Sequence, residues 1–123
     1  MALTGKQIYV VDDDEAVRDS LKILLMTQGA DVRDFDSCEN FIAAYEPSTG
    51  ECLILDVNLP GMSGFDLLSQ LRTERILVPV ILISGNPGTD MLSRARQLGA
   101  IDLLDKPVGF PRLLESLIRA FQS

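Results

Sequence analysis

The chain has 123 residues, 46% hydrophobic and 24% charged, a composition typical of a single globular domain over residues 1–123. Its 18 acidic and 11 basic residues give a net charge of −7, which disfavours direct binding to nucleic acid. Histidine is absent, which excludes a Ser-His-Asp triad, a histidine-bound zinc ion and a phosphohistidine on this chain.

Two features of the sequence favour a cytoplasmic protein. Cys38 and Cys52 lack a metal-binding spacing and are expected to be reduced thiols. No hydrophobic targeting region begins the chain. The longest apolar run, residues 76–83, is much shorter than the ~20 residues that span a bilayer, so no membrane anchor is expected.

Five short apolar runs alternate with five segments of helical period, which predicts a doubly wound (βα)5 fold. This is an α/β three-layer sandwich of the flavodoxin-like type. The runs at residues 8–11, 52–55 and 80–83 are nearly continuous, as in central parallel strands. The runs at 32–35 and 101–104 contain charged residues, as at a sheet edge. Right-handed crossovers then favour the parallel strand order 2-1-3-4-5.

Capping residues predict where the helices begin and end. Ser37 is expected to begin the second helix, Ser63 with Asp66 forms a near capping box at the third, and Pro111 begins the fifth. Gly29 is expected to end the first helix. The side chains expected to face the core are Val17, Leu21, Leu24, Leu25, Phe41, Ile42, Tyr45, Phe65, Leu68, Leu71, Met91, Leu92, Ala95, Leu98, Leu113, Leu114, Leu117, Ile118 and Phe121.

Polar residues follow four of the five predicted strands. They are Asp12, Asp13 and Asp14, then Asp56, then Ser84, and last Asp105 and Lys106. In a doubly wound sheet, ligands bind at the carboxyl ends of the strands, beside the point where strand order reverses. Two carboxylates ~4 Å apart repel by about 4 kcal/mol at an effective dielectric of about 20. Lys106 and a hard divalent cation would offset this repulsion, and Mg²⁺ suits a site of carboxylates, one carbonyl and waters.

Several of these residues also have a simpler interpretation when each is taken alone, and Asp13 could be a second capping candidate. Asp14 is the expected N-cap of the first helix and Glu15 a favourable first-turn acid, so neither is given a catalytic role. Asp56 could cap the turn after it, Ser84 could satisfy backbone groups, and Lys106 could be a solvated charge. These interpretations would have to apply separately at four strand ends that the fold brings together, so a joint site is favoured.

Four segments carry a family resemblance: residues 10–13, 55–64, 83–85 and 105–107. Over essentially its whole length, the chain resembles the receiver (CheY-like) domain of two-component response regulators. The sequence of residues 60–64 is also similar to that of receivers fused to helix-turn-helix output domains.

The resemblance implies a phosphoryl group transferred to Asp56, with Mg²⁺, from a sensor histidine kinase or histidine phosphotransfer protein. The roles it implies are catalytic for Asp56, Lys106 and Ser84, and metal-binding for Asp12, Asp13, Asp56 and the carbonyl of Asn58. The chain would then be no enzyme beyond its own phosphorylation and dephosphorylation. A cis bond is expected at Pro107, and the fourth helix, fifth strand and fifth helix would form a switching face for an output domain or a second copy. One residue departs from the family: Leu103 stands where Tyr or Phe is usual.

Two other functions fit part of the pattern. The first is a pseudo-receiver, an interaction module of the same fold that is not phosphorylated. The second is a haloacid-dehalogenase-type phosphatase, because Asp12, Asp14, Ser84 and Lys106 are similar to parts of its motifs. That enzyme needs a further acidic pair after the lysine, and only Glu115 follows.

Overall fold

The computed structural model describes residues 1–122, which form five strands and five helices in alternation; Ser123, the last residue of the predicted domain, lies outside them. The strands are β1 (Gln7–Val11), β2 (Asp31–Phe35), β3 (Glu51–Asp56), β4 (Val80–Ser84) and β5 (Asp102–Asp105). The helices are α1 (Glu15–Thr27), α2 (Cys38–Ala44), α3 (Gly64–Thr73), α4 (Thr89–Gln97) and α5 (Phe110–Gln122). The predicted alternation is confirmed, with each strand boundary within one residue of the expected position.

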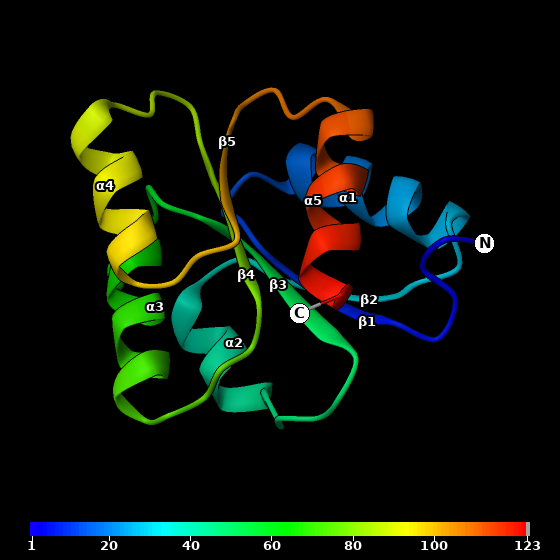
Figure 1. Cartoon of the computed structure of the whole chain (residues 1–123), viewed down its shortest axis with the longest axis horizontal. Helices are drawn as coiled ribbons and strands as arrows, with labels where there is room; N and C mark the ends of the chain where they lie inside the picture. The colour runs from blue at the N-terminus through cyan, green and yellow to red at the C-terminus, as the bar shows by residue number, and fades with distance from the viewer. Residues whose placement is uncertain (123) are drawn as a thin grey trace.

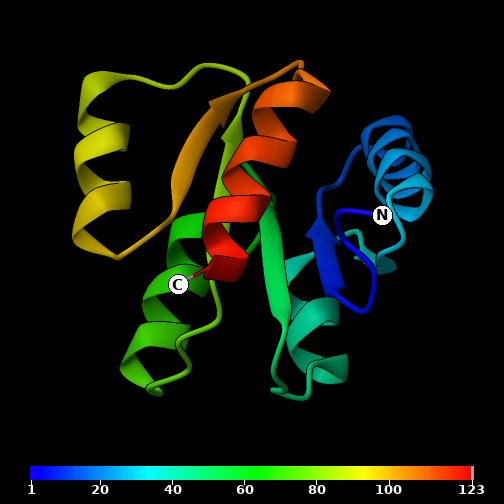
Figure 2. The ribbon, with the colours of Figure 1, turned by 45° about the vertical axis from the view of Figure 1, so that its right-hand side comes forward.

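The strands form one parallel sheet in the predicted order β2-β1-β3-β4-β5. β1 pairs on both sides, so Val10 lies opposite Asp34 of β2 and Ile54 of β3. Strands β3 and β4 are buried throughout, whereas β2 and β5 are partly exposed, as expected of edges. Because all strands run in one direction (Figure 2), their carboxyl ends lie along one edge of the sheet, called here the carboxyl edge.

Helices cover both faces of the sheet (Figure 1): α1 and α5 lie on one face, and α2, α3 and α4 lie on the other. Successive side chains of each strand lie on opposite faces of the sheet. In β1, Ile8 and Val10 pack with the cluster that includes Leu25 of α1, while Tyr9 and Val11 pack with the cluster that includes Phe41 of α2. This period of two gives the three-layer sandwich its two cores.

The helix ends follow the predicted capping chemistry. The Ser63 hydroxyl accepts a hydrogen bond from the Asp66 backbone N–H, and the Asp66 carboxylate accepts one from the Ser63 N–H, both at 3.1 Å. Ser37 caps α2, and Gly29 follows α1 with φ of +94°. The N-caps Ser37 and Ser63 set where the loops at the carboxyl edge end, whereas Gly29 lies at the opposite edge of the sheet, where α1 gives way to β2.

The prediction was wrong for four side chains expected in the core, since Leu24, Ile42, Leu92 and Ile118 are each 37% to 40% exposed. Each lies on the rim of a helix that buries only a narrow stripe against the sheet. In α1, for example, the buried Leu25 is the neighbour of Leu24, and one residue turns the side chain by about 100° around the helix. None of the described helices is long and apolar enough to cross a membrane.

Candidate functional site

The carboxyl edge brings the predicted site residues together from four strands. Asp12 and Asp13 follow β1, Asp56 ends β3, Ser84 ends β4 and Lys106 follows β5. Carboxylate oxygens of Asp12, Asp13 and Asp56 all lie within 4.8 Å of one another. The site is therefore a cluster of three acids beside the point where strand order reverses, between β1 and β3.

Lys106 provides a positive charge within this cluster. Its ammonium nitrogen lies 2.8 Å from Asp12 Oδ2 and 3.0 Å from Asp56 Oδ2. Burial disfavours the charged ammonium, but the bonds with both carboxylates outweigh this effect and raise the pKa of Lys106. The backbone N–H of Lys106 donates to the Ser84 carbonyl at 2.9 Å, and the expected cis bond between Lys106 and Pro107 is present.

Asp56 is buried, and described groups hold both of its carboxylate oxygens. Oδ1 accepts a hydrogen bond from the Asn58 backbone N–H at 3.1 Å, and Oδ2 accepts one from Lys106. Burial raises the pKa of Asp56 above its usual value, although the bonds from Lys106 and Asn58 oppose the shift. The carboxylate is thus fixed in orientation and costly to keep charged, which are properties of a reactive group.

Asp12 offers an oxygen that protein groups do not fully satisfy. Its Oδ1 accepts a hydrogen bond from the Asp14 N–H at 2.9 Å. Its Oδ2 is buried, forms an ion pair with the Lys106 ammonium at 2.8 Å, and has no further partner among the described groups. Three carboxylates and one ammonium leave two negative charges, which one divalent cation would neutralise. This donor set of hard oxygens fits Mg²⁺.

Ser84 and Asn58 contact each other through their side chains, which the sequence did not predict. The Asn58 amide nitrogen donates to Ser84 Oγ at 3.3 Å, and the Asn86 backbone N–H donates to the same oxygen at 3.3 Å. Ser84 therefore does satisfy a backbone group, as its simpler interpretation proposed. It also joins the loop after β3 to the loop after β4.

Gly64 is a second residue whose role the sequence motif alone did not explain. A Cβ at this position would overlap the Asp56 carbonyl oxygen and lie 2.9 Å from Val57 Cα. The Gly64 N–H also donates to the Val57 carbonyl at 3.0 Å. Only glycine lets the start of α3 approach so closely, and this contact holds the backbone on which Asp56 is carried.

The position of the expected aromatic switch is occupied by Leu103 of β5. Leu103 is partly buried and packs against the core cluster shared by α2, α3 and α4, as do Met91 and Leu98. A leucine supplies apolar contact at this place but has no ring that could rotate between two positions.

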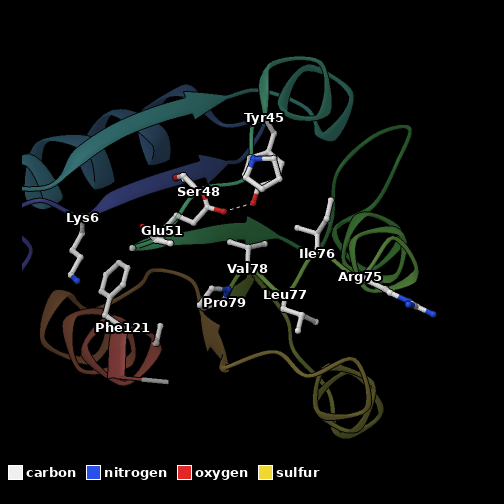
Figure 3. Close-up of a pocket in the computed structure, with 14 residues that line it drawn as sticks. Lys6, Tyr45, Ser48, Glu51, Arg75, Ile76, Leu77, Val78, Pro79 and Phe121 are labelled. Carbon is white, nitrogen blue, oxygen red and sulfur yellow. Dashed lines mark hydrogen bonds between the residues drawn. The ribbon is translucent and has the colours of Figure 1, made fainter.

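A hollow of about 810 Å³ lies at the opposite, amino-terminal edge of the sheet (Figure 3). Its buried acid, Glu51, accepts hydrogen bonds from the hydroxyls of Tyr45 and Ser48. Lys6 lies with its ammonium nitrogen 5.1 Å from the centre of the Phe121 ring. Since Glu51 is already satisfied there, the candidate site is assigned to the carboxyl edge, where the carboxylates converge.

The response regulator receiver domain family matches residues 8–118 of the chain. The transcriptional regulatory protein FixJ of Bradyrhizobium diazoefficiens is 37% identical over 119 residues, which cover 94% of this chain and 58% of that protein. The response regulator protein TodT of Pseudomonas putida is 37% identical over 115 residues, which cover 94% of this chain and 51% of that protein. The chain thus spans little more than half the length of these relatives.

Solved structures give the same result. The response regulator StyR superposes with a TM-score of 0.89 and 36% identity, over 95% of this chain and 59% of that chain. The FixJ-N structure superposes with a TM-score of 0.86 and 33% identity, over 97% of this chain and 95% of that chain. Both superpositions cover nearly the whole chain.

Proposed function

Because this chain belongs to the response regulator receiver domain family of two-component signalling proteins, we propose that Asp56 is the residue that accepts its phosphoryl group. The observation that carries the proposal is the setting of Asp56, a buried carboxylate held by Lys106 and Asn58 and close to Asp12 and Asp13. Asp56 combines burial, a raised pKa and an adjacent ammonium.

The transfer begins with the Asp56 carboxylate as nucleophile. One of its oxygens attacks the phosphorus of a phosphohistidine on a histidine kinase or phosphotransfer protein. The new P–O bond forms as the P–N bond breaks, and the bonding electron pair stays on the imidazole nitrogen of the donor. Lys106, 3.0 Å from Asp56 Oδ2, pairs with a phosphoryl oxygen after transfer.

The acidic cluster would hold Mg²⁺ through Asp13, Asp56 and the Asn58 carbonyl, with Asp12 contributing through water. When bound, Mg²⁺ would neutralise charge on the phosphoryl oxygens. The buried Oδ2 of Asp12 and the excess of two negative charges support this assignment.

The partners and output of the whole protein are part of the proposal, since the chain spans 58% of FixJ and 51% of TodT. We infer that residues 1–123 form one receiver domain, that a kinase or phosphotransfer protein supplies the phosphoryl group, and that the face formed by α4, β5 and α5 contacts an output domain or a second copy. The net charge of −7 supports an indirect role in transcription, without contact between this chain and nucleic acid. Self-catalysed phosphorylation and dephosphorylation, and the cytoplasmic location, remain predictions.

The two alternative functions are not favoured. Residues 8–118 match the receiver domain family, which favours a receiver over a haloacid-dehalogenase-type phosphatase. A pseudo-receiver would not need the complete set of Asp12, Asp13, Asp56, Ser84 and Lys106, which all meet at the carboxyl edge.

The proposal is tested by incubating the protein with phosphoramidate and Mg²⁺ and measuring its intact mass. The wild type should gain one phosphoryl group in a Mg²⁺-dependent reaction, and Asp56→Asn should gain none. Asp105→Asn is the matched control, because Asp105 is an exposed carboxylate at the end of β5, and it should react like the wild type. An equal gain in Asp56→Asn, or none in the wild type, would refute the assignment.

A further inference from the structure

Arg18 of α1 connects three elements beside the acidic cluster. Its Nη1 donates a hydrogen bond to the backbone carbonyl of Asp12 at 2.8 Å. Its Nε lies 3.2 Å from Oδ2 of Asp34, which is on the edge strand β2. Both side chains are largely buried, with 15% of Arg18 and 23% of Asp34 exposed. A guanidinium held at both ends in this way has little freedom to move.

The carbonyl that Arg18 binds belongs to the peptide unit between Asp12 and Asp13. Because a peptide unit is planar, fixing this carbonyl also fixes the N–H of Asp13 and the direction in which Asp13 leaves the strand. The rest of Asp12 is already tied down: its N–H donates to the Phe35 carbonyl at 3.1 Å, and its Oδ1 accepts from the Asp14 N–H. The Arg18 bond is thus the contact that controls the orientation of the following peptide.

We propose that Arg18 is a positioning residue for the acidic cluster, and that Asp34 in turn positions Arg18. By holding the peptide between Asp12 and Asp13, Arg18 keeps the Asp13 carboxylate within reach of Asp12 and Asp56. The edge strand β2, which contributes no residue to the cluster, thereby sets the geometry in which the carboxylates bind a cation. This inference rests on the proposed function, because the ligand of the cluster is taken to be Mg²⁺.

A positioning role for Arg18 and a simple charge effect predict opposite changes in Mg²⁺ affinity when Arg18 is replaced. The positive charge of Arg18 repels a cation, so removing only that charge would tighten Mg²⁺ binding. Losing the hydrogen bond to the Asp12 carbonyl would instead release the peptide and weaken binding. Groups that orient metal ligands typically change metal affinity by about 10-fold to 100-fold when they are removed.

The test compares Arg18→Met with Lys22→Met. Lys22 is on the same helix and lies 3.4 Å from the same Asp34 carboxylate, and the hydrogen bond to the Asp12 carbonyl comes from Arg18. Mg²⁺ is titrated while backbone amide shifts of the site are followed, and Asp13→Asn sets the scale for losing a proposed ligand. We expect Arg18→Met to bind Mg²⁺ about 10-fold more weakly than the wild type, and Lys22→Met to bind it equally or slightly more tightly.

A second readout needs no metal. In the metal-free protein, the Asp13 and Asp14 amides should exchange with solvent faster in Arg18→Met than in Lys22→Met.

Two further variants serve if Arg18→Met does not fold. Arg18→Lys keeps the charge but lacks the planar guanidinium that joins Asp12 and Asp34. Asp34→Asn removes the ion pair and keeps the Asp12 bond. Both should bind Mg²⁺ more weakly than the wild type.

The inference is overturned if Arg18→Met binds Mg²⁺ as tightly as Lys22→Met, or if it lowers only the melting temperature. It is also overturned if Arg18→Lys and Asp34→Asn both match the wild type. These results differ from a failure of the proposed function, in which the wild type itself would neither bind Mg²⁺ nor take up a phosphoryl group.

Discussion

The side-chain amide of Asn58 donates a hydrogen bond to the hydroxyl of Ser84, with 3.3 Å between Asn58 Nδ2 and Ser84 Oγ. The Asn86 N–H donates to the same oxygen. Both contacts use Ser84 as an acceptor, so its hydroxyl proton stays available for a further acceptor at the carboxyl edge. A phosphoryl group on Asp56 would be such an acceptor, and its charge would make it a strong one. We therefore expect a change at Asp56 to reach the loop before α4 through Ser84.

Replacing Ser84 with alanine should separate phosphorylation from the response to it. Asp56, Lys106 and the acidic cluster remain, so Ser84→Ala should still gain one phosphoryl group by intact mass. The hydroxyl that draws the loop is lost, so amide shift changes on phosphorylation should become small over residues 85–98. The free energy of unfolding should fall by only about 1–2 kcal/mol, because each neutral hydrogen bond contributes about 0.5–1.5 kcal/mol.

Ser84→Thr is the matched variant, since it keeps the hydroxyl at the same place. It should retain the shift changes over residues 85–98 that Ser84→Ala loses. Full shift changes in Ser84→Ala would mean that the signal leaves Asp56 by another route.

Lys106→Met should destabilise the protein most strongly in the absence of Mg²⁺. The substitution leaves the buried carboxylates of Asp12 and Asp56 without the ammonium that pairs with both. Removing one partner from a buried ion pair costs about 3 kcal/mol or more. Urea unfolding should show this loss in metal-free buffer, and millimolar Mg²⁺ should recover part of it. Lys22→Met, at a more exposed ion pair, should lose about 1 kcal/mol or less and show no comparable Mg²⁺ effect.

The raised pKa of Asp56 predicts how stability depends on pH. The side chain of aspartate in an unfolded chain has a pKa of about 3.9. Above that pH and below the higher pKa of folded Asp56, the folded chain binds more protons than the unfolded chain. Stability from this group is therefore lost as pH rises through that interval. Asp56→Asn lacks this loss, so its advantage over the wild type in unfolding free energy should be larger at pH 7 than at pH 4.

Metal-free urea unfolding at both pH values measures this difference. If the advantage of Asp56→Asn shrank as pH rose, the Lys106 and Asn58 bonds would outweigh burial, and the pKa of Asp56 would be lowered rather than raised.

Apolar patterning was enough to predict the sheet, because burial on two faces requires continuous apolar strands at its centre. Charged residues such as Arg33 and Asp102 then identified the edges. The convergence of Asp12, Asp56, Ser84 and Lys106 also followed from the fold, since parallel strands bring their carboxyl ends to one edge.

Contacts between elements distant in sequence could not be predicted in this way. Asn58 and Ser84 are 26 residues apart, and Arg18 and Asp34 are 16 apart. No periodic pattern specifies which side chains meet across such separations, because rotamers and the packing of whole helices decide it. The same limit explains Leu24, which has the spacing of a core residue but lies on the rim of α1.

The remaining departure from the family is Leu103. It packs with the same core cluster as Met91 of α4 and Leu98, the residue at the end of that helix. The leucine side chain is smaller than a tyrosine or phenylalanine ring and already contacts this core, so a change in its position displaces less volume. A modification shifts two states only by its different interaction with each of them, so weaker coupling at Leu103 implies a smaller population shift.

We therefore expect phosphorylation to change mainly the loop after β4 and helix α4, with little change at Leu103. Amide hydrogen exchange with and without beryllofluoride and Mg²⁺, a mimic of the phosphoryl group, should show altered protection over residues 84–98. Methyl shifts of Leu103 should change little. In Leu103→Tyr, we expect the larger ring to enter the core when α4 moves, so altered protection should extend to β5. If protection changed only around α1 and left residues 84–98 unaffected, the switching face of α4, β5 and α5 would be wrong, because the signal would have bypassed Ser84.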